Sequence, residues 1–299
     1  MHKNDYEIGS EIRTWGVNIP KRAIVELEKT FASGWINTGP REKQFRQLLT
    51  EAFEANHAIA CNSGTSALKL ALAAAKVGPG DEVISTPYTW LATNTAILEV
   101  GAIPVFADIG ASSLNIDPDS VADKITSKTK AIMCVHFAGN ACDLHRLRDI
   151  AATNQLPLIE DCAHSMGAKY DGKMIGNGAH FACFSFQCVK IVTCGDGGAV
   201  LTSDAESYDT LKRLSWYGVD RDQKKLTFFD SVPMFPEELG FKMNMNDITA
   251  TMACVAMEEL PHALKQRKEL GKIYDEHMVK LERVRAVSRH NLATPNYQI

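Results

Sequence analysis

The chain has 299 residues, 45% of them hydrophobic and 23% charged, a composition typical of a globular protein that buries a large core. Its formal net charge of −4 is not gathered into blocks, and this even distribution argues against binding to nucleic acid or to a membrane surface. We therefore expect small molecules or proteins as partners.

The first residues and the cysteines bear on location. Residues 1–15 are too polar for a signal peptide, and no apolar run reaches the ~18 to 20 residues that span a bilayer. The eight cysteines are scattered and form no CxxC pair, which favours reduced thiols in the core over a zinc or redox site. We expect a cytoplasmic protein with no bound metal.

Short apolar runs alternate with helical patterns between Pro20 and Leu260. The predicted strands cover residues 57–61, 81–86, 103–108, 131–136, 156–161, 180–186 and 198–203. Helical patterns over 65–76 and 90–101 follow the first two strands. Alternation of this kind predicts an α/β fold with a mostly parallel sheet flanked by helices. Such sheets bind their ligands at the carboxyl ends of the strands.

A longer helical pattern begins after Asn246. Hydrophobic residues recur at helical spacing in two groups: Ile248, Met252 and Val255, then Leu270, Tyr274, Met278 and Leu281. This change predicts a large α/β domain over residues 1–245. Residues 246–299 would form connecting helices and the beginning of a smaller C-terminal domain, since so short a segment is little to build an independent domain from.

The stretch CNSGTSALKLAL, residues 61–72, predicts a tight turn between a strand and a helix. The free N–H groups of the helix start and the hydroxyls of Ser63, Thr65 and Ser66 would then face one point, which suits a phosphate. Serine and threonine also cap many helices that bind nothing. Taken alone, the segment favours that simpler interpretation.

Further candidates lie where other predicted strands end. Glu160 and Asp161 close an apolar strand, and a buried carboxylate there needs a partner such as a ligand cation, although Asp161 could also be a structural cap. His164 taken alone is typical of a loop histidine that has no catalytic role. Trp90 opens a helix and could stack on an aromatic ligand, although its segment alone favours a core tryptophan.

The stretch SFQCVKIVTCGDGG, residues 185–198, places Lys190 in an apolar run. Lysine is rarely buried, so Lys190 either extends to solvent or is a nucleophile. A shielded lysine is partly neutral and forms Schiff bases with carbonyls. A lysine chosen at random is far more often exposed. Ser185 precedes Lys190 in the turn that leaves a strand and would bring another hydroxyl to the phosphate.

The candidates share one edge of the predicted sheet. They comprise a Ser/Thr turn, Trp90, Asp161, Ser185 and Lys190. Together they offer what pyridoxal phosphate requires: a phosphate cup, a surface for the ring, a carboxylate that keeps the pyridine nitrogen protonated, and a lysine for the Schiff base. A nucleotide-dependent dehydrogenase would instead need a GxGxxG turn after its first strand, and CNSGTSAL has none. The coenzyme hypothesis is therefore preferred.

The chain resembles the DegT/StrS-type sugar aminotransferases, a fold-type-I family that depends on pyridoxal 5'-phosphate. The matching stretches follow the family's order over nearly the whole chain. They are SGWINTGP (33–40), NSGTSALKLAL (62–72), GPGDEVISTPYTWLATNTAI (78–97), GAIPVFADI (101–109), EDCAHSMGA (160–168), SFQCVKIVTCGDGG (185–198), LKRLSWYGVDR (211–221) and GFKMNMNDITA (240–250).

The resemblance implies roles for individual residues. Lys190 corresponds to the lysine that holds the coenzyme as an internal aldimine, and Asp161 to the partner of the pyridinium nitrogen. Trp90 corresponds to the aromatic residue that stacks on the ring. The positions that match the phosphate site are Ser63, Gly64, Thr65, Ser66 and Ser185.

Two further assignments follow from the resemblance. His164 stands where many family members have glutamine, near the ring hydroxyl. In the family, the segment that matches residues 240–247 reaches across a dimer interface into the neighbouring site, which nominates Asn244 and then Lys242. A helix-entry loop capped by Asn246 would explain the same segment. The resemblance thus implies a homodimer with shared active sites.

The resemblance also implies a reaction, the transfer of an amino group from glutamate or glutamine to a keto group of a nucleotide-linked deoxysugar. One alternative is a sugar dehydratase on the same scaffold, but such relatives replace the lysine with histidine. Another is a non-catalytic regulatory protein or an inactive fragment, because family members usually continue for several tens of residues beyond the position of Ile299. Residues 220–238 would help to select the sugar.

Overall fold

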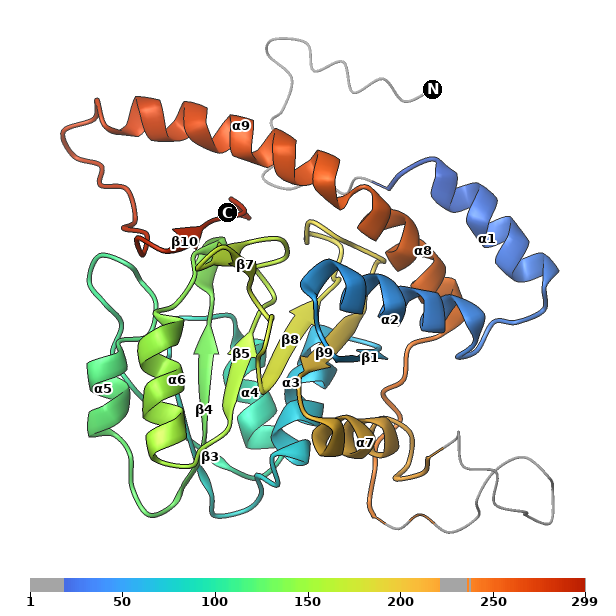
Figure 1. The fold of residues 1–299 in the computed structure, drawn as a ribbon, viewed down its shortest axis with the longest axis horizontal. Coiled ribbons are helices and arrows are strands. Elements are labelled where there is room, and N and C mark those ends of the chain that lie inside the picture. Colours follow the sequence, from blue (N-terminus) through green and yellow to red (C-terminus); the bar gives the residue numbers. More distant parts are fainter. Residues whose placement is uncertain (1–18, 221–235, 237, 299) are drawn as a thin grey trace.

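A seven-stranded sheet runs through the molecule (Figure 1) in a computed structural model that describes residues 19–220, 236 and 238–298. The strand order is β1-β9-β8-β5-β4-β2-β3. The strands are β1 (His57–Cys61), β2 (Glu82–Ser85), β3 (Ile103–Phe106), β4 (Thr129–Val135), β5 (Leu158–Asp161), β8 (Phe181–Ser185) and β9 (Gly198–Thr202). Each predicted strand has formed, and the predicted α/β class is confirmed.

The sheet is parallel except at β9, which pairs antiparallel with both β8 and β1. Two reversals cancel, so β1 points the same way as β8, β5, β4, β2 and β3. The carboxyl ends of these strands therefore meet at one edge. This edge is where the sequence predicts the ligand site.

Helices cover both faces of the sheet (Figure 1). One face carries α2 (Pro40–Phe53), α5 (Pro118–Asp123), α6 (Leu144–Thr153) and α8 (Asp247–Glu258). The other carries α3 (Gly64–Ala74), α4 (Leu91–Glu99) and α7 (Ala205–Leu214). The remaining helices are α1 (Arg22–Ala32), which packs on α8, and α9 (Leu260–Met278), which follows α8 along the chain.

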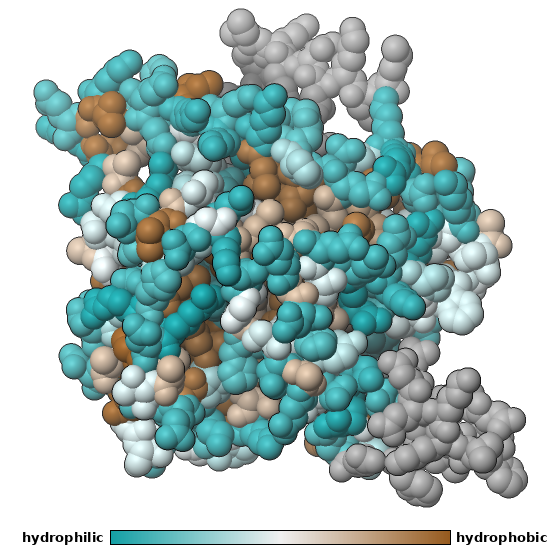
Figure 2. Space-filling view, in the orientation of Figure 1, coloured by the Kyte–Doolittle hydropathy of each residue, from teal (hydrophilic) through white to brown (hydrophobic). Residues whose placement is uncertain are grey.

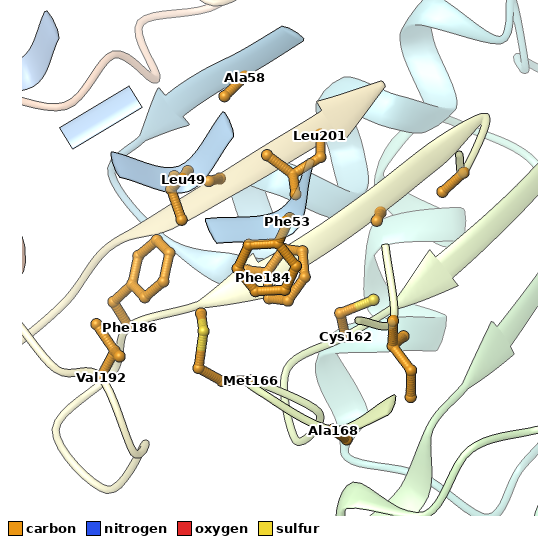
Figure 3. Packing of buried hydrophobic residues seen from close by; sticks show 14 of the residues in the cluster. Leu49, Phe53, Ala58, Cys162, Met166, Ala168, Phe184, Phe186, Val192 and Leu201 are labelled. Atoms are coloured by element: carbon orange, nitrogen blue, oxygen red, sulfur yellow. The ribbon is translucent and has the colours of Figure 1, made fainter. Parts of the chain in front are cut away.

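Alternate side chains of β8 contribute to the hydrophobic cores on the two faces of the sheet. Phe181 and Cys183 face the side of α3, whereas Ala182 and Phe184 face the side of α2. Figure 3 shows the second side, where the Phe184 ring lies against Phe53 with ring centroids 4.8 Å apart. Residues of α8 join this core, and Asn246 caps the helix by accepting a hydrogen bond from the Thr249 N–H.

The second C-terminal helix is shorter than its sequence pattern predicts. Leu281 was expected to extend the helical spacing, but α9 ends at Met278. Beyond it the Lys280 N–H bonds to the His277 carbonyl and the Leu281 N–H to the Met278 carbonyl. These three-residue turns replace helical bonds, so the prediction for Leu281 is wrong. The proposed division at residues 245 and 246 stays a prediction.

A small second sheet lies beside the carboxyl ends of the main strands. Its order is β10-β6-β7, formed by Ala293–Thr294, Lys169–Tyr170 and Lys173–Met174. The C-terminal segment and α9 thus pass over the edge that carries the predicted site (Figure 1). Hydrophilic residues cover most of the face in Figure 2, and within the described ranges no helix is long and apolar enough to cross a membrane.

Candidate active site

A cavity of about 730 Å³ lies at the carboxyl ends of the strands. Its lining includes side chains or backbone from the ends of β1, β4, β5 and β8. Of the ten residues predicted to bind the coenzyme, the cavity brings together Ser63, Gly64, Thr65, Trp90, Asp161, His164, Ser185 and Lys190. Ser66 and Asn244 are not among the lining residues.

The Ser63–Ser66 turn caps α3 at the wall of the cavity. Ser63 caps α3, because its Oγ accepts a hydrogen bond from the Ser66 N–H at 3.1 Å. The Ser66 hydroxyl donates to Asn62 Oδ1 at 2.7 Å, which accounts for its absence from the cavity. Thr65 lines the cavity at the helix N-terminus, where N–H groups and the helix dipole favour a bound anion.

Two glycines allow the turns that form this end of the cavity to meet. A Cβ on Gly64 would lie 2.6 Å from the Ser185 Cβ, and a Cβ on Gly198 would lie 2.2 Å from the Ser63 carbonyl oxygen. Both distances are shorter than any side chain tolerates without a shift of its neighbours. The glycines therefore let the backbone after β1 and the end of β8 converge on one point.

Asp161 closes β5 and is buried at the cavity wall. Its Oδ2 accepts a hydrogen bond from Thr93 Oγ1 at 2.8 Å, and its Oδ1 accepts one from the Ala163 N–H at 3.1 Å. Burial raises the pKa of the carboxyl group, opposed by these two hydrogen bonds and by the positive charge of Lys190. In the part of the chain that the structure describes, Asp161 has no salt bridge.

Glu160, the neighbouring carboxylate, is held differently. It faces the opposite side of β5, where Oε2 lies 3.3 Å from His136 Nε2 and Oε1 accepts a hydrogen bond from Arg148 at 3.0 Å. Burial alone would raise its pKa, but His136 and Arg148 hold the pKa below the ordinary value. Glu160 is thus satisfied within the protein, whereas Asp161 keeps only neutral hydrogen-bond donors.

His136, Glu160 and Cys162 also place three possible metal-ligand atoms within 4.8 Å of one another. His136 and Glu160 already form hydrogen bonds within the protein. Arg148 occupies one carboxylate oxygen, and the Cys142 N–H donates to His136 Nδ1 at 3.1 Å. We interpret this cluster as a buried hydrogen-bond network under the cavity.

His164 lies at the cavity wall as a neutral ring. Burial, and secondly the charge of Lys190, lower its pKa to about 4. The Ala138 N–H donates to Nδ1 at 3.4 Å, so the single proton of the neutral ring is on Nε2. His164 can therefore offer an N–H donor to a ligand.

Lys190 is largely shielded from solvent in the loop that follows β8. Burial lowers the pKa of its amine, and the negative charge of Asp161 opposes that shift. The extended, fully solvated lysine that the sequence left open is therefore not observed. A lowered pKa increases the fraction of neutral amine, the form that attacks carbonyls.

Trp90 stands at the mouth of the cavity and is 73% exposed. It precedes the first residue of α4, so its indole is outside the helix and outside the core. The alternative of a core tryptophan, which the segment alone favoured, is wrong. An exposed aromatic plate beside a cavity is suited to stacking on a flat ligand.

Asn244 lies elsewhere in the protomer, in a separate cavity of about 310 Å³. Its Oδ1 accepts a hydrogen bond from Lys242 Nζ at 2.6 Å, and its backbone forms a bridge with Cys61. Lys242 and Asn244 thus neighbour each other but do not line their own protomer's cavity. The prediction that residues 220–238 help to select the sugar concerns residues that lie almost wholly outside the described ranges, which exclude 221–235 and 237.

The profile of the DegT/DnrJ/EryC1/StrS aminotransferase family matches residues 18–298. The chain belongs to this family. The spore coat polysaccharide biosynthesis protein SpsC of Bacillus subtilis (strain 168) is 38% identical over 257 residues. That match covers 86% of this chain and 66% of SpsC, so the chain spans slightly less than two thirds of this relative.

Solved structures of other proteins share the fold. Sugar aminotransferase CalS13 from Micromonospora echinospora superposes with a TM-score of 0.89 at 29% identity, covering 96% of this chain and 79% of CalS13. DesV of S. venezuelae, solved in complex with a ketimine intermediate, gives a TM-score of 0.86 at 30% identity, covering 93% of this chain and 72% of DesV. The fold is that of the fold-type-I aminotransferases.

Some residues of this DegT/DnrJ/EryC1/StrS site escaped the sequence predictions. Thr93 binds Asp161, and Thr89, Gln187 and Asp196 line the cavity. Thr93 had a usable signal, because it follows Trp90 by three residues and a helix places such residues on one side. Gln187 and Asp196 lie in irregular turns, where no periodicity indicates direction.

Proposed function

We propose that the chain is a pyridoxal phosphate-dependent aminotransferase that moves an amino group from glutamate or glutamine to a keto group of a nucleotide-linked deoxysugar. The observation that carries this proposal is the convergence in one cavity of a shielded lysine, a buried carboxylate that forms no salt bridge among the described residues, and a helix N-terminus. Membership of an aminotransferase family supports it.

The cavity residues fit the coenzyme chemically. The Ser63–Thr65 turn and Ser185 would hold the phosphate, because Gly64 and Gly198 leave room for close approach of the two backbones. Trp90 would cover one face of the ring. The carboxylate of Asp161 would pair with the ring nitrogen, and a cation there would relieve the cost of burying its charge. His164 would donate from Nε2 to the ring hydroxyl.

The bound coenzyme would supply an electron sink for the substrate carbon that loses its proton. Asp161 would keep the ring nitrogen protonated by holding a negative charge beside it. Lys190 would supply the amine that anchors the coenzyme and would serve as the general base and general acid of the proton transfer. Burial lowers the pKa of this amine and so increases the fraction in the neutral form.

The substrates and assembly are proposed from the family. Two similar proteins, a polysaccharide biosynthesis protein and a sugar aminotransferase, favour a sugar acceptor. Asn244 would reach the neighbouring protomer's site in a homodimer, which agrees with its place outside its own cavity. A cytoplasmic location stays a prediction.

The experiment for this proposal is an amino-transfer assay. Protein loaded with pyridoxal phosphate is incubated with glutamate or glutamine and a panel of keto-deoxysugar nucleotides, and the aminated sugar is detected by mass spectrometry. We expect one or a few panel members to be aminated, and Lys190→Ala to abolish the product. Loading of the coenzyme without transfer to any sugar would reject the acceptor class, and transfer by Lys190→Ala would reject the assigned nucleophile.

A further inference from the structure

The C-terminal segment 293–298 connects elements that surround the candidate site. Its first residues form β10, which pairs with β6, so that Ala293 lies opposite Tyr170 and Thr294 opposite Lys169. The following residues lie against the loop that carries His164 and the loop that carries Lys190. The segment therefore contacts two site-bearing loops that are separated in sequence.

Asn296 is the central residue of these contacts. It is 3% exposed, and its Nδ2 donates to the carbonyl oxygens of His164, at 2.8 Å, and Met166, at 2.9 Å. Its Oδ1 accepts a hydrogen bond from the Gln298 N–H at 3.0 Å. Both protons of the amide and its oxygen are thus used, as a buried amide requires. Asparagine is the only residue of this size that offers two donors and an acceptor at one point.

The Asn296 amide also packs against the turn that donates a hydrogen bond to the His164 ring. A Cβ on Gly139 would lie 1.7 Å from Asn296 Oδ1 and 3.0 Å from the His164 carbonyl oxygen. Ala138, beside it, has a φ of 55°, a left-handed conformation that costs a non-glycine residue free energy. This strained conformation aims the Ala138 N–H at His164 Nδ1. The packing of Asn296 against Gly139 holds the turn in place.

The two residues after Asn296 hold the end of the segment in place. Tyr297 is tied to α9, because its carbonyl oxygen accepts a hydrogen bond from Arg267 at 2.9 Å and its hydroxyl donates to Asp275 at 3.1 Å. Gln298 donates from Nε2 to the Val189 carbonyl oxygen at 3.2 Å, one residue before Lys190. The Asn296 amide is therefore supported by α9 and by the Lys190 loop.

We propose that Asn296 is a positioning residue of the coenzyme site, which acts through His164. Its amide holds the His164 carbonyl oxygen on one side of the loop. It also packs against Gly139, and the turn at Gly139 holds the His164 ring through Nδ1. The imidazole is then fixed as an Nε2–H donor at the cavity wall. This inference rests on the proposed function, since it takes pyridoxal phosphate as the ligand that the donor meets.

The test is a double-mutant cycle on coenzyme affinity. The dissociation constant of pyridoxal phosphate is measured for the wild type, Asn296→Asp, His164→Ala and the double variant. Aspartate keeps the shape and the acceptor of Asn296 but loses the donors to the two carbonyls. We expect each single change to raise the dissociation constant about ten-fold, and the double variant to match His164→Ala rather than show the product of both effects. Asn291→Ala, a change at an exposed asparagine two residues before the segment, should match the wild type.

A second readout does not involve the coenzyme. In the coenzyme-free protein, Asn296→Asp should speed hydrogen exchange in residues 137–139 and leave exchange in the distant helix α7 unchanged. If Asn296→Asp does not fold, Asn296→Ala replaces it in the same cycle. Independent effects of the two sites, or wild-type affinity in a folded Asn296 variant, would overturn the inference. Failure of the wild type to bind pyridoxal phosphate at all would instead reject the proposed function.

Discussion

Two adjacent carboxylates have different surroundings because neighbouring residues of a strand face opposite sides of the sheet. Glu160 and Asp161 point to opposite faces of β5, and only Glu160 meets protein cations, His136 and Arg148. The sequence predicts that one of this pair needs a ligand, because both follow an apolar run. It does not reveal that Arg148 and His136 approach from one side, since neither is near Glu160 in the chain.

Asp161→Asn separates stability from activity. The pKa of Asp161 is raised in the folded state, so folding favours the protonated carboxyl, and the associated stability is lost as pH rises through the folded pKa. At neutral pH without coenzyme the ionised group is therefore a cost, and we expect Asp161→Asn to raise the melting temperature. Amino transfer should fall by at least about 100-fold, because the ring nitrogen loses its anionic partner. The melting temperature of the variant minus that of the wild type should be larger at pH 7.5 than at pH 4. A smaller difference at pH 7.5 would contradict this reasoning.

His164 gives a prediction with the opposite sign. Its folded pKa of about 4 lies below the ordinary value, so the folded state loses stability relative to the unfolded state as pH falls from about 6.5 towards 4. His164→Gln should reduce this acid sensitivity in coenzyme-free protein, as measured by urea unfolding at several pH values. Because glutamine also offers an N–H donor, coenzyme affinity should stay within about three-fold, whereas His164→Leu should weaken it about ten-fold. If the His164→Gln and His164→Leu variants bind the coenzyme with equal affinity, His164 does not act as a hydrogen-bond donor to it.

Contacts between distant parts of the chain limit what the sequence predicts at the residue scale. Most of the site residues were predictable, since strand ends in a parallel sheet meet at one edge whatever lies between them. Asn296 was not, because the partners of its amide are 130 and 132 residues away. Its segment, ATPNYQI, carries no periodic pattern that would indicate a buried amide.

At the scale of elements, the sheet was predictable and its direction at one strand was not. Alternation of apolar runs and helical patterns locates β1 to β5, β8 and β9, but hydrophobicity does not distinguish a parallel from an antiparallel neighbour. The connection from β8 to β9 contains the turn with Lys190 and no helix, whereas the crossover between parallel strands is usually a helix. The lack of a helical pattern in this connection could have identified the reversal at β9.

Gly198 links this reversal to the phosphate turn. It opens β9 opposite both Cys61 and Ser185, and a Cβ there would meet the Ser63 carbonyl oxygen at 2.2 Å. We expect Gly198→Ala to displace the turn, to destabilise the protein by about 1 to 3 kcal/mol, and to weaken binding of pyridoxal phosphate. Gly78→Ala is the matched control, because a Cβ at Gly78 meets nothing within 4 Å. Calorimetry of both variants provides the comparison, and equal coenzyme affinity would show that the close approach is not needed.

At the scale of the whole molecule, several large apolar side chains are exposed to solvent. Trp90, Leu91 and Leu98 on and before α4 are all at least 60% exposed, as is Ile24 on α1. Large exposed apolar side chains of this kind are typical of a surface that another chain covers. They support the proposed homodimer without specifying its geometry.

A shared site predicts complementation between two inactive variants. If Asn244 acts in the neighbouring protomer, Lys190→Ala and Asn244→Ala should each be impaired as homodimers. After mixing with exchange of subunits, half of the dimers are mixed and each has one site with both residues intact. Activity should then recover to about a quarter of the wild-type value. No recovery, with mixed dimers demonstrated by mass spectrometry, would assign Asn244 to its own protomer or to a structural role.

The most direct test of the account is covalent trapping of the coenzyme. The purified protein is incubated with pyridoxal phosphate, reduced with borohydride, digested and analysed by peptide mass spectrometry. We expect one modified residue, Lys190, close to full occupancy, and no corresponding modification in Lys190→Ala. Modification at a different lysine, or equal labelling of the wild type and Lys190→Ala, would contradict the assignment of this cavity as the coenzyme site.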